Sequence, residues 1–230
     1  MEGLNFDLRQ QTVRDLNSFL HSAEGKAKRG TIEVHHPDGA HSIAAGLNAP
    51  VKVVVHGHAG YYAAGMNMHA DITIEGSAGT GVAENMMSGR VHVKGFASNS
   101  AGASAHGGLL VIDGNAALRC GISLKGGNIV VGGSVGSFSA FMAQAGRMVV
   151  CGDAGDGLGD SLYEAVLYVK GSIKSLGADA QLEPMGPEDL QIVTDLLAQA
   201  GMAKHSAADF KRVASKRELY HWNADANQEY

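Results

Sequence analysis

Three stretches of the chain read Ile72-Thr73-Ile74-Glu75-Gly76, Val91-His92-Val93-Lys94-Gly95 and Leu110-Val111-Ile112-Asp113-Gly114, and each begins 19 residues after the one before. The pattern continues in both directions. Apolar residues, most of them β-branched, stand four and two positions before each glycine, which is typical of a short, half-buried strand that ends at a corner. Each 19-residue repeat therefore predicts one coil of a solenoid. The corner glycines are Gly57, Gly76, Gly95, Gly114, Gly133, Gly152 and Gly171.

Two further columns of the repeat hold small residues. Seven positions after the corner glycine every coil has Ala or Gly, and thirteen positions after it a second glycine-rich column marks another corner. Glycine suits corners because it adopts positive φ at no steric cost and lets two backbones approach closely. No helical periodicity is present in the repeat, and its period is not a multiple of six. We therefore expect an all-β fold, a right-handed parallel β-helix of about seven 19-residue coils.

The flanking segments predict caps at both ends of the solenoid. Thr12-Val13-Arg14-Asp15 matches a capping box and opens a helix over about 12–22, and residues 30–50 predict an irregular first coil. Pro187 opens a second helix that Gly201 ends. The expected segments are thus 1–50 with the N-terminal helix and first coil, 51–180 with the β-helix, and 181–230 with the C-terminal helix and an aromatic-containing docking tail.

The composition excludes several classes of protein. The chain has 32 Gly among 230 residues but only 4 Pro, so it cannot be collagen-like. Its 45% hydrophobic residues and net charge of -5 disfavour disorder, and the mild acidity disfavours nucleic-acid binding. Residues 126–146 are uncharged but contain six Gly, so the repeat explains them better than a membrane span. Two cysteines and no signal-peptide pattern predict a cytoplasmic protein.

Two glycine-rich motifs suggest chemistry that the repeat explains better. Gly132-Gly133-Ser134-Val135-Gly136 matches the nucleophile elbow G-x-S-x-G, yet both outer glycines belong to columns of the repeat and no helix follows. The run from Gly152 to Asp160 contains three aspartates and could form a phosphate- or calcium-binding turn. Those aspartates do not recur in the other coils, so a structural corner is the favoured interpretation and an ion site is the alternative.

Histidine, cysteine and basic residues raise three further hypotheses. The histidines suggest a metal site, but no carboxylate or further His falls at ligand spacing on the next coil. The favoured interpretation is that they are surface or cap residues. Cys120 and Cys151 lie in different columns and are interpreted as inert, small hydrophobic residues. We assign no catalytic, cofactor-binding or metal-binding residue. The six histidines concerned are His35, His36, His41, His56, His58 and His69. A basic run predicts a solvated face, or alternatively contact with an acidic partner: Lys211, Arg212, Lys216 and Arg217.

Four blocks of the sequence carry a resemblance to a known family. They are Gly-Tyr-Tyr-Ala-Ala-Gly-Met-Asn at 60–67, Gly-Val-Ala-Glu-Asn-Met-Met-Ser-Gly at 81–89, Gly-Asp-Ala-Gly at 152–155 and Lys-Ser-Leu-Gly-Ala-Asp at 174–179. Together with the coil glycines they resemble the GXGXG domain that closes the large subunit of glutamate synthase, which is a right-handed β-helix. Among free-standing forms, the chain is most similar to the small GXGXG subunit of N-methylglutamate synthase. The C-type subunit of formylmethanofuran dehydrogenase shares the repeat but resembles these blocks less.

The resemblance implies a non-catalytic scaffold subunit of a hetero-oligomeric flavoprotein complex. That complex would form N-methylglutamate and ammonia from methylamine and glutamate. The implied partners are a glutaminase-like subunit and an FMN-binding synthase-like subunit, and FMN and an iron–sulfur cluster are expected on those partners. No nucleic acid or membrane is expected as a partner. The candidate partner-facing residues are Tyr61, Tyr62, Asn67, Asn85 and Trp222.

Two alternatives remain open at this point. A stand-alone glutamate synthase could contain the same kind of scaffold. A carbohydrate-acting β-helix is the alternative from a different class, and such proteins usually show carboxylate clusters or aromatic ladders on one lateral face. The column expected to face outward has neither, since it holds Tyr61, Thr80, Asn99, Leu118, Ser137 and Asp156.

Overall fold

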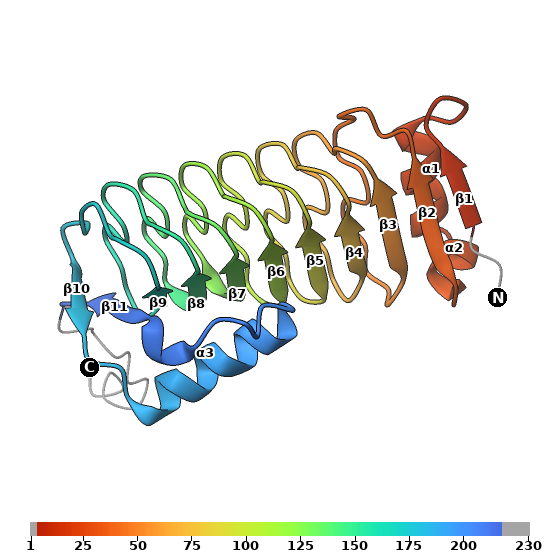
Figure 1. Cartoon of the computed structure of the whole chain (residues 1–230). Coiled ribbons are helices and arrows are strands. Elements are labelled where there is room, and N and C mark those ends of the chain that lie inside the picture. The colour runs from red at the N-terminus through yellow and green to blue at the C-terminus, as the bar shows by residue number, and fades with distance from the viewer. Residues whose placement is uncertain (1–3, 218–230) are drawn as a thin grey trace, which may run out of the picture.

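The computed structural model describes residues 4–217, and most of them form a parallel β-solenoid of about seven coils. Figure 1 shows the strands side by side along a rod, with two short helices at its N-terminal end and a longer helix beneath its C-terminal half. The predicted fold class is confirmed. The strands are β1 (Leu4–Asp7), β2 (Thr31–His35), β3 (Lys52–His56), β4 (Asp71–Ile74), β5 (Arg90–Val93), β6 (Leu109–Ile112), β7 (Lys125–Val131), β8 (Ala145–Val150), β9 (Val166–Val169), β10 (Ala180–Glu183) and β11 (Lys211–Ser215). The helices are α1 (Val13–His21), α2 (Ala23–Ala27), α3 (Pro187–Gln199) and the 3-10 turn η1 (Ala207–Asp209).

The strands of successive coils stack in register, as the 19-residue period requires. Val53 pairs with Ile72, Ile72 with Val91, and the series continues without a shift to Met148 and Leu167. These side chains point inward and are almost completely buried, which makes one continuous apolar column along the axis. The first coil is more regular than expected. Strand β2 pairs with β3 over its whole length, and Ile32 stands opposite Val53, so that coil simply has two extra residues.

The corner glycines follow from close packing between coils rather than from positive φ. Gly57 has a φ of 140°, but none of the other six corner glycines has a positive φ. A Cβ at Gly76 would lie 2.6 Å from the carbonyl carbon of Gly57, and one at Gly171 would lie 2.5 Å from the carbonyl oxygen of Gly152. For this column free φ is therefore wrong and close backbone approach is confirmed. In the second corner column the prediction of positive φ is confirmed for Gly89, Gly108 and Gly146, with φ of 82°, 81° and 95°.

Positive φ occurs instead in the turn of each coil, at every second residue. Five, seven and nine positions after the corner glycine the backbone is left-handed in all six complete coils, for example at Tyr62, Ala64 and Met66 with φ of 59°, 55° and 53°. Their N–H groups point alternately to the next and the preceding coil: Tyr62 donates to Thr80 at 2.8 Å, and Ala64 to Ile43 at 2.9 Å. The small residues in the seventh position are thus selected by a buried, left-handed site.

An outer layer covers only part of the sheet. The apolar outward side chains of β6 to β9 form a second cluster with the inner face of α3, in which Val149 and Val193 are fully buried. Figure 1 shows α3 beneath these strands and shows β2 to β5 without such cover. The predicted C-terminal helix is confirmed, with Pro187 in its first turn and Gly201 directly after it at a φ of 75°.

The two ends of the rod are capped by different secondary-structure elements, a helix at one end and an antiparallel strand at the other. At the N-terminus the Thr12 hydroxyl accepts a hydrogen bond from the Asp15 N–H, and the Asp15 carboxylate accepts one from the Thr12 N–H. The predicted capping box of α1 is therefore confirmed. At the C-terminus β11 inserts antiparallel between β9 and β10. Arg212 on β11 forms ion pairs with Glu183 and Asp189, so the prediction of a solvated basic face is wrong for that residue.

Candidate partner-binding surface

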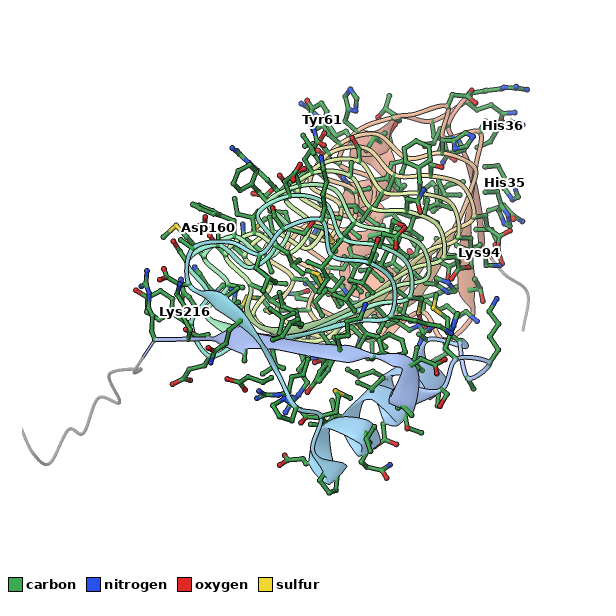
Figure 2. The ribbon with its side chains drawn as sticks, turned by 60° about the vertical axis from the view of Figure 1, so that its left-hand side comes forward. His35, His36, Tyr61, Lys94, Asp160 and Lys216 are labelled. Atoms are coloured by element: carbon green, nitrogen blue, oxygen red, sulfur yellow. The ribbon has the colours of Figure 1, made fainter. Side chains whose placement is uncertain are left out.

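The exposed apolar side chains of the solenoid gather on one side, which we name the turn face. It comprises the residues four to eleven positions after the corner glycine, namely 61–68, 80–87, 99–106, 118–125, 137–144 and 156–163. Among residues 4–217, seven of the nine exposed large hydrophobic residues belong to it: Tyr61, Met66, Met87, Leu118, Phe138, Met142 and Tyr163. Figure 2 shows Tyr61 and Asp160 on one side of the rod, turned away from His35 and Lys94 on the strand side.

The turn face is also poor in charge. Only five of its 48 residues are charged, although 18% of the whole chain is. Exposed Tyr, Phe and Met combined with few charges are the composition of a protein–protein interface core. The five charged residues are Glu84, Arg119, Lys125, Asp156 and Asp160. The turn face therefore has the chemistry of a docking surface for another protein.

The structure places the predicted partner-facing residues unevenly. Tyr61 is 54% exposed and stacks on His41 with the ring centroids 3.8 Å apart, whereas Tyr62 and Asn85 are half-buried. The prediction for Asn67 is wrong, because its side chain is completely buried and donates to the carbonyl oxygens of two corner residues. Trp222 lies outside the described residues.

A groove crosses the middle of the turn face. It has a volume of about 630 Å³ and lies over the four coils whose corner glycines are Gly76, Gly95, Gly114 and Gly133. Leu118 and Phe138 line it with 49% and 45% of their surface exposed. The residues that line this groove were not among the predicted partner-facing residues, because their column of the repeat varies from coil to coil: it holds Gly81, Ser100, Arg119, Phe138 and Gly157. The lining residues are Thr80, Asn99, Ser100, Leu118, Arg119, Ser137 and Phe138.

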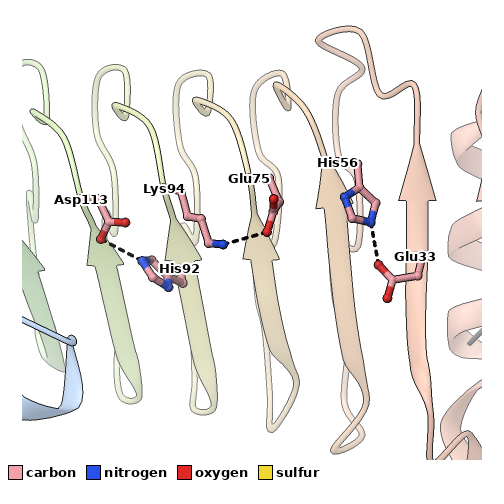
Figure 3. A network of polar contacts seen from close by, with 6 residues as sticks. All are labelled: Glu33, His56, Glu75, His92, Lys94 and Asp113. Carbon is pink, nitrogen blue, oxygen red and sulfur yellow. Dashed lines mark hydrogen bonds and ion pairs between the residues drawn. The ribbon is translucent and has the colours of Figure 1, made fainter.

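The strand side of the first coils is polar and internally paired. Figure 3 shows three contacts between neighbouring strands: His56 with Glu33 at 2.6 Å, Lys94 with Glu75 at 2.8 Å, and His92 with Asp113 at 2.8 Å. The Lys94 ammonium lowers the pKa of Glu75, and Glu75 raises that of Lys94. These side chains already satisfy one another, so this surface offers less to a partner than the turn face does.

The histidines that suggested a metal site are each engaged locally. His36 contacts Asp7 at 2.8 Å, His58 accepts the N–H of Ser77 at 2.9 Å, and His35 stacks on the ring of His56. Among residues 4–217, no three His, Cys, Asp or Glu side chains are grouped so that they could hold a metal ion. The favoured interpretation as surface and cap residues agrees with these contacts.

The two glycine-rich motifs are corners in which side chains cap the next coil. Ser134 of the G-x-S-x-G match accepts the N–H of Asp153 at 2.9 Å, and Asp153 in turn accepts from the N–H and hydroxyl of Ser172 at 2.7 and 2.8 Å. These bonds lower the pKa of Asp153. Asp156 pairs with Lys174 at 2.7 Å. The carboxylates are thus used within the stack, in agreement with a structural role.

Both cysteines are buried, as their interpretation requires. Burial raises the pKa of Cys120 to about 12 and that of Cys151 to about 11. Since the thiolate is the nucleophilic form, neither thiol is activated for reaction at neutral pH.

In the part of the chain that the structure describes, no helix is long and apolar enough to cross a membrane.

Comparison with known proteins gives one extended similarity. No family model matches the chain. The chain is 52% identical over 224 residues to "Protein GlxC" of Rhizobium meliloti (strain 1021), and the alignment covers 97% of this chain and 98% of that protein. The similarity therefore includes the cap helices and the solenoid together.

Proposed function

Since the chain belongs to the GlxC family, we propose that it is the scaffold subunit of a glutamate synthase-like flavoprotein complex. The complex that its sequence blocks resemble most is N-methylglutamate synthase, which converts methylamine and glutamate into N-methylglutamate and ammonia. In this proposal the chain itself carries no catalytic residue. A glutaminase-like subunit and an FMN-binding synthase-like subunit supply the chemistry, with FMN and an iron–sulfur cluster on those partners.

The observation that supports this role best is the turn face. Its apolar side chains project from a backbone in which every second N–H group is hydrogen-bonded, alternately to the next and to the preceding coil, so their spacing is fixed by the stack. A rigid, apolar surface can hold two other proteins in a constant relation. Reaction sites that pass an intermediate between them depend on such constant spacing, because misplacement of reacting groups by about 1 Å can cost a hundredfold in rate.

The proposal is tested by isolating the complex through a tag on this chain. We expect two further subunits, a flavin absorption spectrum, and formation of N-methylglutamate that requires methylamine and glutamate. The tagged chain alone is the control and should not turn over. Turnover by the chain alone would refute the scaffold role. Dependence on glutamine and 2-oxoglutarate instead of methylamine would assign the chain to a stand-alone glutamate synthase, the alternative within this class.

A further inference from the structure

The groove on the turn face contains a cation that residues 4–217 leave unpaired. Arg119 lines the groove and is exposed. It forms no ion pair or side-chain hydrogen bond with any of residues 4–217, and it is the one charged residue among the seven that line the groove. Of the other exposed side chains there, Leu118 and Phe138 are apolar and stand beside and after Arg119, whereas Thr80 and Asn99 are polar and uncharged.

The backbone beneath these side chains is preorganised. Ser100, Arg119 and Phe138 occupy the same position of three successive coils, with φ of 59°, 58° and 57°. Their N–H groups donate to the carbonyl oxygens of the following coil at 2.9, 3.0 and 2.7 Å. Neighbouring coils repeat at about 4.8 Å, so the three side chains leave the surface side by side at that spacing.

The position that Arg119 occupies in its coil favours glycine, and two other coils have glycine there. Gly81 and Gly157 stand at the same place in the coils that follow the corner glycines Gly76 and Gly152, with φ of 72° and 65°. A left-handed backbone is unfavourable for residues with a Cβ, and Arg119 is exposed with no partner among residues 4–217 to offset that cost. Gly157 also leaves space for the ring of Phe138, which would lie 3.0 Å from a Cβ at residue 157. An exposed arginine that forms no ion pair or side-chain hydrogen bond within residues 4–217 is best explained by a contact outside them.

Building on the proposed function, we propose that this groove binds a segment of a partner subunit that presents a carboxylate side chain between apolar side chains. The carboxylate pairs with Arg119, whose planar guanidinium can donate two parallel hydrogen bonds to it. The apolar neighbours pack on Leu118 and Phe138. Arginine and aromatic residues at the centre of an interface are the ones that most often dominate its binding energy.

The test separates binding from folding. The two proposed partner subunits, produced separately, are titrated onto the immobilised chain, and Arg119→Gly is compared with wild type. Because glycine suits this backbone, the variant should melt no lower than wild type, yet the dissociation constant for one partner should rise at least about tenfold. Arg119→Lys should give an intermediate value, because an ammonium keeps the charge but not the paired geometry. Lys52→Glu, an exposed site on strand β3, is the matched control and should change binding less than twofold.

A charge swap gives the more specific readout. Crosslinking from residue 138 identifies the partner segment, and Arg119→Asp should lose binding that a Lys in place of the partner's carboxylate restores. Unchanged partner binding by both Arg119→Gly and the pair Leu118→Ala with Phe138→Ala would overturn the groove while the scaffold role stands. Binding of neither subunit to wild type would instead refute the scaffold role and the groove with it. A dimer of the chain that Arg119→Gly dissolves would overturn the proposed occupant in favour of a second copy.

Discussion

Substitution of Gly76 by alanine tests the close packing that shapes every coil. A Cβ there would lie 2.6 Å from the carbonyl carbon and oxygen of Gly57 and 2.8 Å from the nitrogen of His58, all of them backbone atoms. The two coils must separate by about 1 Å to reach ordinary contact distances. That separation breaks the Gly76 N–H bond to Gly57, 3.0 Å long, and strains the next one from Gly95 to Gly76, 2.9 Å long. Overpacking of about 1–3 kcal/mol and about 1 kcal/mol for each weakened hydrogen bond give a loss of about 3 kcal/mol.

Thermal denaturation followed by circular dichroism measures this loss. For a chain of this size about 1 kcal/mol lowers the Tm by about 2–4 °C, so we expect a decrease of about 6–12 °C. Gly201→Ala is the control, because no atom lies within 4 Å of its Cβ position and only its φ of 75° opposes alanine. That control should cost about 1 kcal/mol. A Tm decrease for Gly76→Ala no larger than that of the control would refute the steric explanation of the glycine column.

Three further outcomes follow from individual side chains. In a Cys151→Ser background, iodoacetamide should not label Cys120 in the native protein and should label it in urea, because burial raises its pKa to about 12; native labelling would show that the coil interior opens. Asp153→Asn should lower the Tm at pH 7, and its difference from wild type should shrink as the pH falls below about 3.8, since the folded pKa of Asp153 is lowered and the stability from its charge, present above the unfolded value of about 3.8, is lost as the pH falls through the folded value; a Tm difference that does not change with pH would contradict this. Asn67→Ala should destabilise the fold by about 1–3 kcal/mol, measured by urea denaturation, through loss of its buried hydrogen bond to the Ala70 carbonyl and its partly buried one to the Ser88 carbonyl; an unchanged midpoint would contradict a structural role for this side chain.

The repeat made the solenoid predictable because stacked coils must present the same residue type at the same place. The column from Val53 to Leu167 specified strand, register and core at once. The C-terminal helix was predictable from Pro187 and its apolar stripe. Strand β11 was not, because an antiparallel insertion between β9 and β10 depends on tertiary pairing that leaves no local period in the sequence.

The site was predictable only in part. Tyr61 was correctly placed on the surface, because it stands in an outward column of the repeat. Asn67 stands in the same block but turns inward, because the left-handed residues around it alternate the direction of successive side chains and its amide bonds a corner of the stack. The sequence blocks that carry the family resemblance do not indicate whether a residue in them is buried or exposed. The exposure of Phe138 and the unpaired Arg119 emerge only when the coils are stacked.

Oxidative footprinting of the chain alone and in its complex tests the central claim most directly. Hydroxyl radicals oxidise exposed Met and aromatic side chains, and the turn face offers Met66, Phe138 and Met142 with 44–48% of their surface exposed. We predict that oxidation at these residues falls several-fold on assembly, while the exposed Leu182 on β10 reacts as before. Unchanged oxidation on the turn face in an active complex, with protection elsewhere, would contradict the assignment of this face as the docking surface.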